Sequence, residues 1–439
     1  MTTRGASRDR RRRARALGAA GCILGAVLAG CGTTSTVPRA PGATLTIGTL
    51  YAGSGQFAGS SLPELAGLRF WVRWEDRRGG AYVGSLGRRV RLRLVALDDR
   101  SSPALAARLY RRLVQVDHVE ILVSDFGSVL TAPAIPVAER AQMLLFDQSG
   151  TGSAFFLGDN PYLVLCDLPS SAVWPDPLVA FLEAERLDRV AIVYAGNDFD
   201  AAQDTTIATA LTSAGKAPVA NLEVPTATRH YRRLLAPLRA RGAQAVIELG
   251  YQDNDLAFLP ELARYRRDHP WPALRFVFTA FPGQLHALFQ AQVGAQALAG
   301  TFTYGLPPTV DHRKVTLGLD LTRFSADFAA RSHRPVNFLD VAGYTTGVVI
   351  EAALRRAGSL SQLALRAALN AVSGHLETLD GVFRIDGAGA QLGERPSVAE
   401  LFPTGPAGTT LRVVFPPSEA TRRPLLVGSA PSQPGDPQT

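Results

Sequence analysis

The sequence predicts an α/β protein built from two doubly wound, Rossmann-like lobes joined by hinge crossovers. The chain has 439 residues, of which 46% are hydrophobic and 19% charged, which is the length and balance of two globular domains. Short β-branched runs alternate with helical patterns from residue 44 onward, and the alternation restarts near residue 190. Two such sheets imply a cleft between them, and ligands of open α/β sheets bind beyond the carboxyl ends of the strands.

The first lobe is expected to begin with a strand over 45–51. A helix follows over 63–76, with Ser60 or Ser61 as its N-cap. Residues 90–97 alternate with a period of two, which is the pattern of an ordinary strand. The further elements expected in this lobe are a helix over 103–116, a strand over 120–124, a helix near 132–140 and a strand over 143–146.

The second lobe repeats the alternation of strands and helices. Its expected strands are 190–194, 219–224, 245–249 and 275–279, and its expected helices are 201–214, 231–241 and 256–267. The tail over 416–439 is rich in Pro, Ser and Gly, a composition that predicts disorder.

The charge of the chain is concentrated near its N-terminus. The net charge is +8, but residues 1–30 hold seven arginines and one aspartate, so six of the eight charges lie there. An apolar run without charges follows over 16–28; it is shorter than a membrane span and has the pattern of a secretory signal. The rest of the chain carries only +2, which excludes nucleic acid as the expected partner.

The signal ends in a motif that resembles the lipobox of bacterial lipoproteins, Leu28-Ala29-Gly30-Cys31. The resemblance implies that residues 1–30 are removed, that Cys31 is acylated, and that 31–43 form a flexible tether. The expected location is the outer face of the cell membrane, or the periplasm and outer membrane, which Gly32 favours if the bacterium has two membranes. The alternative is a chance cysteine in an ordinary signal peptide.

Signatures of catalysis or of a metal site are missing from the sequence. The seven histidines are scattered, and no zinc, nucleophile-elbow or phosphate-loop motif occurs. Gly53, Gly55 and Gly59 follow the first strand, but the last spacing is one residue too long for a dinucleotide fingerprint. Cys166 is the only cysteine after Cys31, so the mature chain forms no internal disulfide, and a buried thiol is expected. We therefore expect no enzyme, no cofactor and no metal.

An ordered set of segments resembles the solute-binding proteins of ABC transporters of the branched-chain amino acid (Leu/Ile/Val-binding) type. The similarity covers roughly residues 45–415 and implies the type I periplasmic binding protein fold. The segments that carry it are Ile47–Leu50, Gly53–Gly59, Leu97–Pro103, Val123–Ser128, Ser149-Gly150-Thr151, Val193–Phe199, Gly250-Tyr251 and Gly343-Tyr344, the last pair opening a long helix.

The resemblance implies that the chain crosses between the lobes more than once. Residues 44–166 then form the first part of lobe 1, and 167–281 the first part of lobe 2. The chain is expected to return to lobe 1 over 282–375, and to complete the hinge and lobe 2 over 376–415.

The resemblance also implies a ligand site. Ser128 and Thr151 match hydroxyls that hold an amino acid's α-carboxylate, and Ser149 matches a main-chain carbonyl that accepts from the ligand ammonium. The aromatic walls match Phe57, Phe199 and Tyr251. Ser128 follows a strand at a helix entry, where an anion is favoured. The alternative is that the serines and the threonine only cap a helix and form turns.

One position departs from the family pattern. After the strand that ends near Thr279, the family presents an acidic residue for the ligand ammonium, whereas this chain has Ala280 and Phe281. A buried ammonium without a counter-carboxylate is costly. We therefore expect a carboxylate or a neutral apolar or aromatic ligand rather than an ordinary amino acid. Asp147 and Asp340 remain alternative sources of the missing charge, which keeps amino acids open.

The function that the resemblance implies is capture of a small solute between the lobes and delivery to an ABC permease and its ATPase. The partners are then the solute, the permease and, through the lipid anchor, the membrane. The alternative is a lipoprotein of the same fold that does not transport, and acts as a ligand sensor or as an activator scaffold for a cell-wall synthase.

Overall fold

The computed structural model describes residues 44–426. The predicted signal peptide (1–30), Cys31 with the tether (31–43) and the last part of the tail (427–439) lie outside the described residues. Within 44–426, no helix has both the length and the hydropathy of a membrane-crossing segment.

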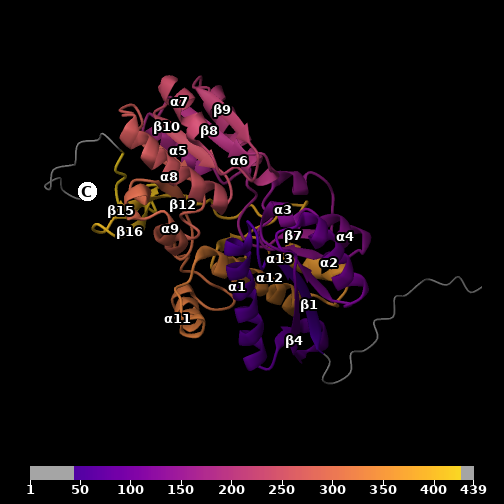
Figure 1. Ribbon diagram of the computed structural model, residues 1–439. Helices are drawn as coiled ribbons and strands as arrows, with labels where there is room; N and C mark the ends of the chain where they lie inside the picture. The colour runs from indigo at the N-terminus through magenta and orange to yellow at the C-terminus, as the bar shows by residue number, and fades with distance from the viewer. Residues whose placement is uncertain (1–43, 427–439) are drawn as a thin grey trace, which may run out of the picture. The chain divides into compact units, whose positions relative to one another are not determined.

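The first lobe is built on a five-stranded parallel sheet in the order β4-β1-β5-β6-β7 (Figure 1). The strands are β1 (Leu45–Tyr51), β4 (Leu92–Asp98), β5 (Ile121–Val123), β6 (Leu145–Asp147) and β7 (Leu163–Leu165). Six of the seven residues of β1 are buried, on both faces, as expected for a parallel strand that helices cover on both sides. The Cys166 thiol follows β7, and burial raises its pKa well above the ordinary value, so it is the buried thiol that we expected.

The second lobe is built on a seven-stranded sheet. Five strands, β9-β8-β10-β11-β12, are parallel, and β15 and β16 extend the sheet antiparallel. The strands are β8 (Val190–Ala195), β9 (Ala220–Val224), β10 (Ala245–Leu249), β11 (Phe276–Thr279), β12 (Phe302–Gly305), β15 (Ser397–Pro403) and β16 (Thr409–Phe415).

Helices connect and cover these strands. The long helices are α1 (Ala58–Arg77), α2 (Pro103–Gln115), α5 (Asp176–Ala184), α6 (Asp198–Ser213), α7 (Arg232–Ala240), α8 (Gln252–Asp268), α11 (Leu321–Ser332), α12 (Phe338–Arg356) and α13 (Gln362–Val372). The shorter elements are α3 (Gly127–Thr131), α4 (Ile135–Arg140), α9 (His286–Gln292), α10 (Ala295–Leu298), two 3-10 turns (Gly84–Leu86 and Ser153–Phe156), and the hairpins β2 (Ala81–Val83) with β3 (Arg88–Val90) and β13 (Leu376–Thr378) with β14 (Gly381–Phe383).

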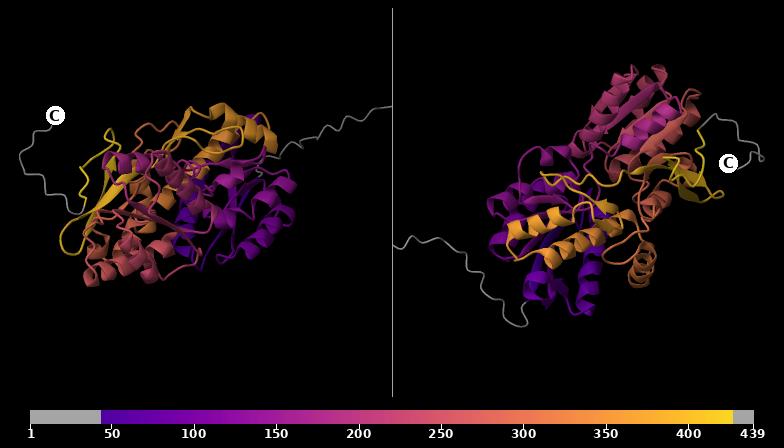
Figure 2. Two further views of the ribbon diagram at one scale, coloured as in Figure 1. Left: turned by 90° about the horizontal axis from the view of Figure 1, so that it is seen from above. Right: turned by 180° about the vertical axis from the view of Figure 1, so that it is seen from behind.

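Helices α1 and α12 pack backbone against backbone within the first lobe. A Cβ at Gly343 would lie 1.9 Å from the Glu64 carbonyl oxygen, and one at Gly67 would lie 2.0 Å from the Asp340 carbonyl oxygen. Both contacts require glycine because any side chain would push the helices apart. In Figure 2, α12 and α13 (orange) accordingly lie with the first lobe, although they follow the second lobe in sequence.

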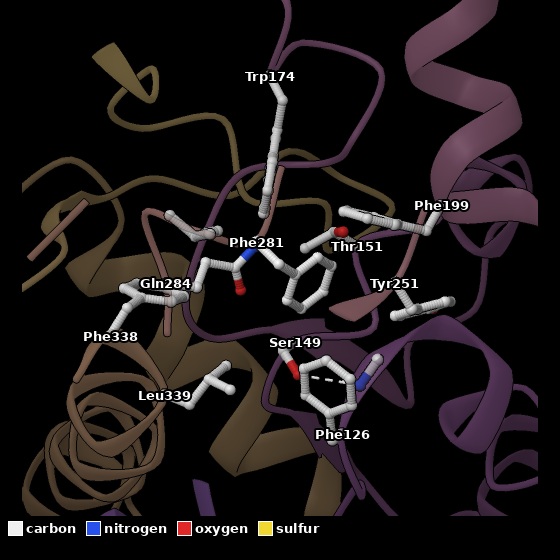
Figure 3. Close-up of a pocket in the computed structure, with 12 residues that line it drawn as sticks. Phe126, Ser149, Thr151, Trp174, Phe199, Tyr251, Phe281, Gln284, Phe338 and Leu339 are labelled. Atoms are coloured by element: carbon white, nitrogen blue, oxygen red, sulfur yellow. Dashed lines mark hydrogen bonds between the residues drawn. The ribbon is translucent and has the colours of Figure 1, made fainter. Parts of the chain in front are cut away.

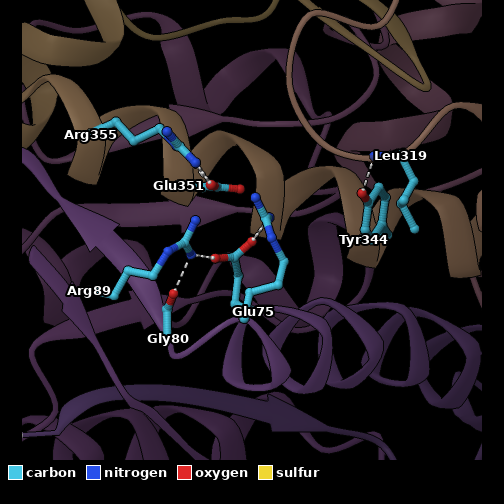
Figure 4. Close-up of polar contacts among 8 residues, drawn as sticks. Glu75, Gly80, Arg89, Leu319, Tyr344, Glu351 and Arg355 are labelled. Carbon is cyan, nitrogen blue, oxygen red and sulfur yellow. Dashed lines mark hydrogen bonds and ion pairs between the residues drawn. The ribbon is translucent and has the colours of Figure 1, made fainter.

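A buried carboxyl pair lies toward the C-terminal ends of these two helices (Figure 4). Glu75 accepts from Arg78 at 2.7 Å and from Arg89 at 3.0 Å, and Glu351 pairs with Arg355 at 2.6 Å. Burial, together with the charge of the nearby Glu351, nevertheless raises the pKa of Glu75 to about 7. The arginines therefore only partly offset the loss of hydration.

The predicted fold class is confirmed, and the local differences have physical causes. Helix α1 begins at Ala58, so Ser60 and Ser61 lie inside it and neither is its N-cap. The Ser60 hydroxyl is 2.5 Å from the Gln252 side-chain oxygen, and the Ser61 hydroxyl donates to Asp125 at 2.6 Å. Tertiary contacts therefore use these hydroxyls.

Three further elements differ from the expected ranges. The strand expected over 90–97 is interrupted at Arg91, which separates the β2–β3 hairpin from β4. The helix expected near 132–140 corresponds to the shorter α4, and a separate short helix, α3, precedes it. The long helix expected to open at Gly343 begins at Phe338, where Asn337 and Asp340 form a capping box.

The later crossings of the chain also differ from the expected ranges. Strand β12 pairs with β11, so this part of the segment 282–375 lies in the second sheet and not in the first lobe. Of the tail predicted to be disordered, the structure describes residues 416–426. Most of these residues are exposed, but the Leu425 N–H donates to Glu400 at 2.8 Å, and Leu426 is buried. The end of this segment is therefore anchored on β15.

Candidate functional site

A narrow cavity lies where the carboxyl ends of both sheets meet (Figure 3). The residues that line it come from the loops after β5, β6, β7, β10 and β11, and from the first turns of α6 and α12. They are Phe126, Gly127, Ser149, Thr151, Leu168, Trp174, Phe199, Tyr251, Phe281, Gln284, Phe338 and Leu339.

Hydroxyl groups and backbone N–H groups meet on the first-lobe side of the cavity. The Ser149 hydroxyl accepts from the Gly127 N–H at 3.0 Å, and the Ser128 hydroxyl accepts from the Gly152 N–H at 2.9 Å. The Thr151 carbonyl accepts from both the backbone and the hydroxyl of Ser171, which holds this loop in place. The Thr151 hydroxyl oxygen is buried and has no hydrogen-bond partner among the described residues.

Aromatic rings form the body of the cavity wall. Phe199 lies 5.5 Å from Tyr251, centroid to centroid, with the rings tilted by 30°. Trp174 meets Phe199 edge to face at 5.3 Å. Phe57 contacts Tyr251 from behind at 5.0 Å and does not itself line the cavity.

The structure brings all six predicted ligand-binding residues to one region of the cleft. Four of them line the cavity: Ser149, Thr151, Phe199 and Tyr251. Phe57 and Ser128 support the wall from behind, because the Phe57 ring packs on Tyr251 and the Ser128 hydroxyl is bonded to Gly152. Whether they contact a ligand remains a prediction.

Sequence reasoning missed part of the wall. Phe126 and Gly127 lie in the loop after β5, and Gln284 lies in the loop after β11. Because ligands of open α/β sheets bind beyond the carboxyl ends of the strands, these three residues could have been predicted. Trp174 comes from the crossover between the lobes, and Phe338 and Leu339 come from the first turn of α12. No local pattern marks these three, since only the packing of the two lobes places them together.

Among the described residues, no charged side chain lines this cavity. Asp147 is buried behind it and accepts from Ser124 at 2.9 Å and from the Gly150 N–H at 2.8 Å. Asp340 accepts from both terminal nitrogens of Arg334 at 2.6 Å. Both candidates for the missing counter-charge are therefore bonded elsewhere.

The position after β11 also carries no charge. Ala280 and Phe281 are fully buried there, and the Phe281 ring forms part of the wall. Glu64 lies behind Ser149, and burial raises its pKa well above the ordinary value. The cavity lining consequently has no charged side chain, half of its residues are aromatic, and hydroxyl and N–H groups lie at one end.

Residues able to bind a metal do not gather anywhere in the described chain, where no group of three or more His, Cys, Asp or Glu side chains has a metal-binding arrangement.

Comparison with known proteins identifies the family of the chain. A family model described as periplasmic binding protein matches residues 44–404. The chain belongs to the periplasmic binding protein family. It has the type I fold with two lobes and is a solute-binding protein of the ABC transporter type, a family of substrate-binding proteins rather than enzymes. Family membership implies an exported protein.

Three solved structures of similar fold have sequences that are 15–18% identical to this periplasmic binding protein. A solute-binding protein from R. palustris in complex with benzoate has 18% identity and a TM-score of 0.68, and the match covers 84% of this chain and 95% of that one. A solute-binding protein from Rhodopseudomonas palustris in complex with 3,4-dihydroxybenzoic acid has 16% identity and a TM-score of 0.68. That match covers 87% of this chain and 99% of the other. A leucine-binding protein from Thermotoga maritima has 15% identity and a TM-score of 0.69, and the match covers 85% of this chain and 99% of the other. At these identities the likeness shows the fold.

Proposed function

We propose that the protein captures a small carboxylate with an apolar or aromatic body between its lobes and delivers it to an ABC permease. The observation that carries the proposal is the composition of the cavity wall, where six of the twelve residues are aromatic and none is charged. An ammonium group enclosed there would lose its hydration without a counter-carboxylate, which costs several kcal/mol in order of magnitude. An ordinary amino acid is therefore a poor fit.

The first-lobe end of the cavity supports a carboxylate. The Thr151 hydroxyl there is a donor without a partner among the described residues, and hydrogen bonds to an ionised acceptor are stronger than those to a neutral one. Burial raises the pKa of Glu64 behind Ser149, which favours the uncharged form of this carboxyl group. Two proteins of similar fold were solved in complex with benzoate and with 3,4-dihydroxybenzoic acid, which are aromatic carboxylates.

The mechanism follows from the origin of the wall. Ser149 and Thr151 belong to the first lobe, and Tyr251 and Phe281 to the second, so a bound solute contacts both lobes and stabilises the closed arrangement. The aromatic rings exclude water around the solute body. In this proposal the permease recognises the closed form, and acylated Cys31 holds the protein near the membrane.

Differential scanning fluorimetry of the purified protein tests the proposal. Benzoate, 4-hydroxybenzoate, leucine and valine are added at equal concentrations, and a ligand that binds the folded state raises Tm with its concentration. We expect stabilisation by the aromatic carboxylates. Stabilisation by leucine or valine but by no carboxylic acid contradicts the ligand class. Absence of stabilisation by any compound contradicts solute capture and favours the scaffold role.

A further inference from the structure

Two polar atoms in the cavity have no hydrogen-bond partner among the described residues. They are the Thr151 hydroxyl oxygen and the Gln284 side-chain nitrogen. Thr151 is 2% exposed and Gln284 is 3% exposed, and both line the same cavity. Buried polar groups of folded proteins are nearly always paired, so an unpaired one in a binding cavity indicates a ligand atom that pairs with it.

The two atoms come from opposite lobes. Thr151 follows β6 of the first sheet, and Gln284 follows β11 of the second. Figure 3 shows the Gln284 amide pointing toward the Phe281 ring, while Thr151 lies beside Phe199. A solute whose carboxylate is held near Thr151 therefore directs its other end toward Gln284, with aromatic rings along its body.

The backbone at Gln284 is itself held in place. The Gln284 N–H donates to the Phe281 carbonyl at 2.9 Å, and its carbonyl accepts from the Phe338 N–H at 3.3 Å. The preceding Gly283 donates to the Thr303 hydroxyl at 3.0 Å, and a Cβ at Gly283 would lie 2.0 Å from the Tyr304 carbonyl. This close packing fixes the backbone from which the Gln284 side chain extends.

We propose that Gln284 determines specificity by donating to a hydrogen-bond acceptor at the end of the solute opposite its carboxylate. The proposal rests on the proposed function and narrows the solute to an aromatic carboxylate that carries a distal oxygen. The amide NH₂ is a donor and is mismatched to a distal ammonium, and a distal methyl group leaves it unpaired. A site built to hydrogen-bond one group discriminates strongly against an analogue that lacks it.

Isothermal titration calorimetry of the purified protein tests the proposal with probes that differ only at the distal end. 4-Formylbenzoate has an acceptor and no donor, 4-hydroxybenzoate has both, and 4-methylbenzoate has neither. We expect the wild-type protein to bind 4-formylbenzoate at least about tenfold more tightly than 4-methylbenzoate. The proposal is overturned if 4-hydroxybenzoate binds more tightly than 4-methylbenzoate while 4-formylbenzoate does not. That result would mean that the protein recognises the distal group as a hydrogen-bond donor.

Variants then assign the preference to the side chain. In Gln284→Leu we expect the ratio of the two dissociation constants to fall to about one, because the variant has no amide to pair with the formyl oxygen or to leave unpaired beside the methyl group. Gln284→Met serves the same purpose if the leucine variant does not fold. Gln296→Leu, on an exposed position of α10, is the matched control and should keep the wild-type ratio.

The outcomes separate the two proposals. If the wild type binds all the benzoates equally well, or if the ratio survives in Gln284→Leu, the role of Gln284 is overturned and the proposed function stands. If none of the benzoates binds, both are overturned.

Discussion

The Tyr251 hydroxyl accepts a hydrogen bond from the backbone N–H of Ser128 at 3.2 Å, and this bond joins the two lobes across the cleft. Tyr251 precedes α8 in the second lobe, whereas Ser128 lies in the first turn of α3 in the first lobe. A second contact between the lobes lies outside the cavity, between Ser60 and Gln252 at 2.5 Å. The closed arrangement thus has polar contacts of its own.

Removal of the Tyr251 hydroxyl is expected to favour the open form. Tyr251→Phe keeps the ring and deletes one hydrogen bond, worth about 0.5–1.5 kcal/mol, so the open population should rise about two- to twelvefold. Small-angle X-ray scattering of the unliganded protein measures the change as a larger radius of gyration. Ser60→Ala removes a contact of the same kind away from the cavity and should act in the same direction. Scattering identical to the wild type in both variants would mean that these contacts do not set the equilibrium.

Trp174 is expected to contribute strongly to solute binding. Its indole N–H donates to the Pro169 carbonyl at 2.6 Å, which fixes the ring at the cavity wall. Trp174→Ala should weaken binding of an aromatic carboxylate by about 2 kcal/mol, roughly 30-fold in Kd, as measured by calorimetry. Trp74→Ala is the control, since Trp74 lies on α1 under Arg78 and does not line the cavity. Equal losses in both variants would assign the effect to stability rather than to contact.

The packing of α1 on α12 depends on the absence of a side chain at Gly343. Gly343→Ala places a Cβ 1.9 Å from the Glu64 carbonyl oxygen and should lower the free energy of unfolding by about 1–3 kcal/mol. Gly358→Ala is the matched control, because a Cβ there meets nothing within 4 Å. Denaturant unfolding measures both, and a Gly343→Ala protein as stable as the control would show that the helices can separate at little cost.

The stability of the protein should fall as pH rises through neutrality. In the folded protein the pKa of Glu75 is raised from 4.5 to about 7. The folded state therefore binds this proton more tightly than the unfolded state. The stabilisation is complete below pH 4.5 and is lost as pH rises through about 7. Burial also raises the pKa of Glu400 to about 7 and that of Asp147 to about 6, so they act in the same direction.

Thermal unfolding between pH 5.5 and pH 8.5 measures this loss. Glu75→Gln has no charge to gain, so its Tm should fall less over that range than the Tm of the wild type. Glu183→Gln, on an exposed position of α5, is the control and should follow the wild-type curve. A Tm that rises with pH, or a wild-type slope in Glu75→Gln, would refute the assignment.

The proposed lipid anchor rests on Cys31 alone. In Cys31→Ser the exported protein should move from the membrane fraction to the soluble fraction, because two or more acyl chains are needed for stable attachment. Fractionation followed by immunoblotting measures this. Retention of the variant in the membrane would mean that another contact holds the protein there.

Much of the fold could be predicted because each strand and helix carries its own pattern. The strands over 45–51 and 245–249 were predicted with the bounds that β1 and β10 have in the structure. Where tertiary contacts override the local pattern, prediction differed: Ser60 and Ser61 are good N-caps by type, yet they bond to Gln252 and Asp125 inside α1. The helices α1 and α12 meet through glycines almost 280 residues apart, which no local window can detect.

The sequence by itself determined the two-lobed α/β architecture, the family, and the loss of the acidic position after β11, since these depend on residue types and their order along the chain. Only the tertiary structure decided what replaces that acid. In the folded protein Asp147 and Asp340 are hydrogen-bonded to groups outside the cavity. Trp174, Gln284 and Phe338 line the cavity together. The reason is that a binding wall between two lobes is assembled from side chains whose neighbours are set by packing and not by sequence spacing.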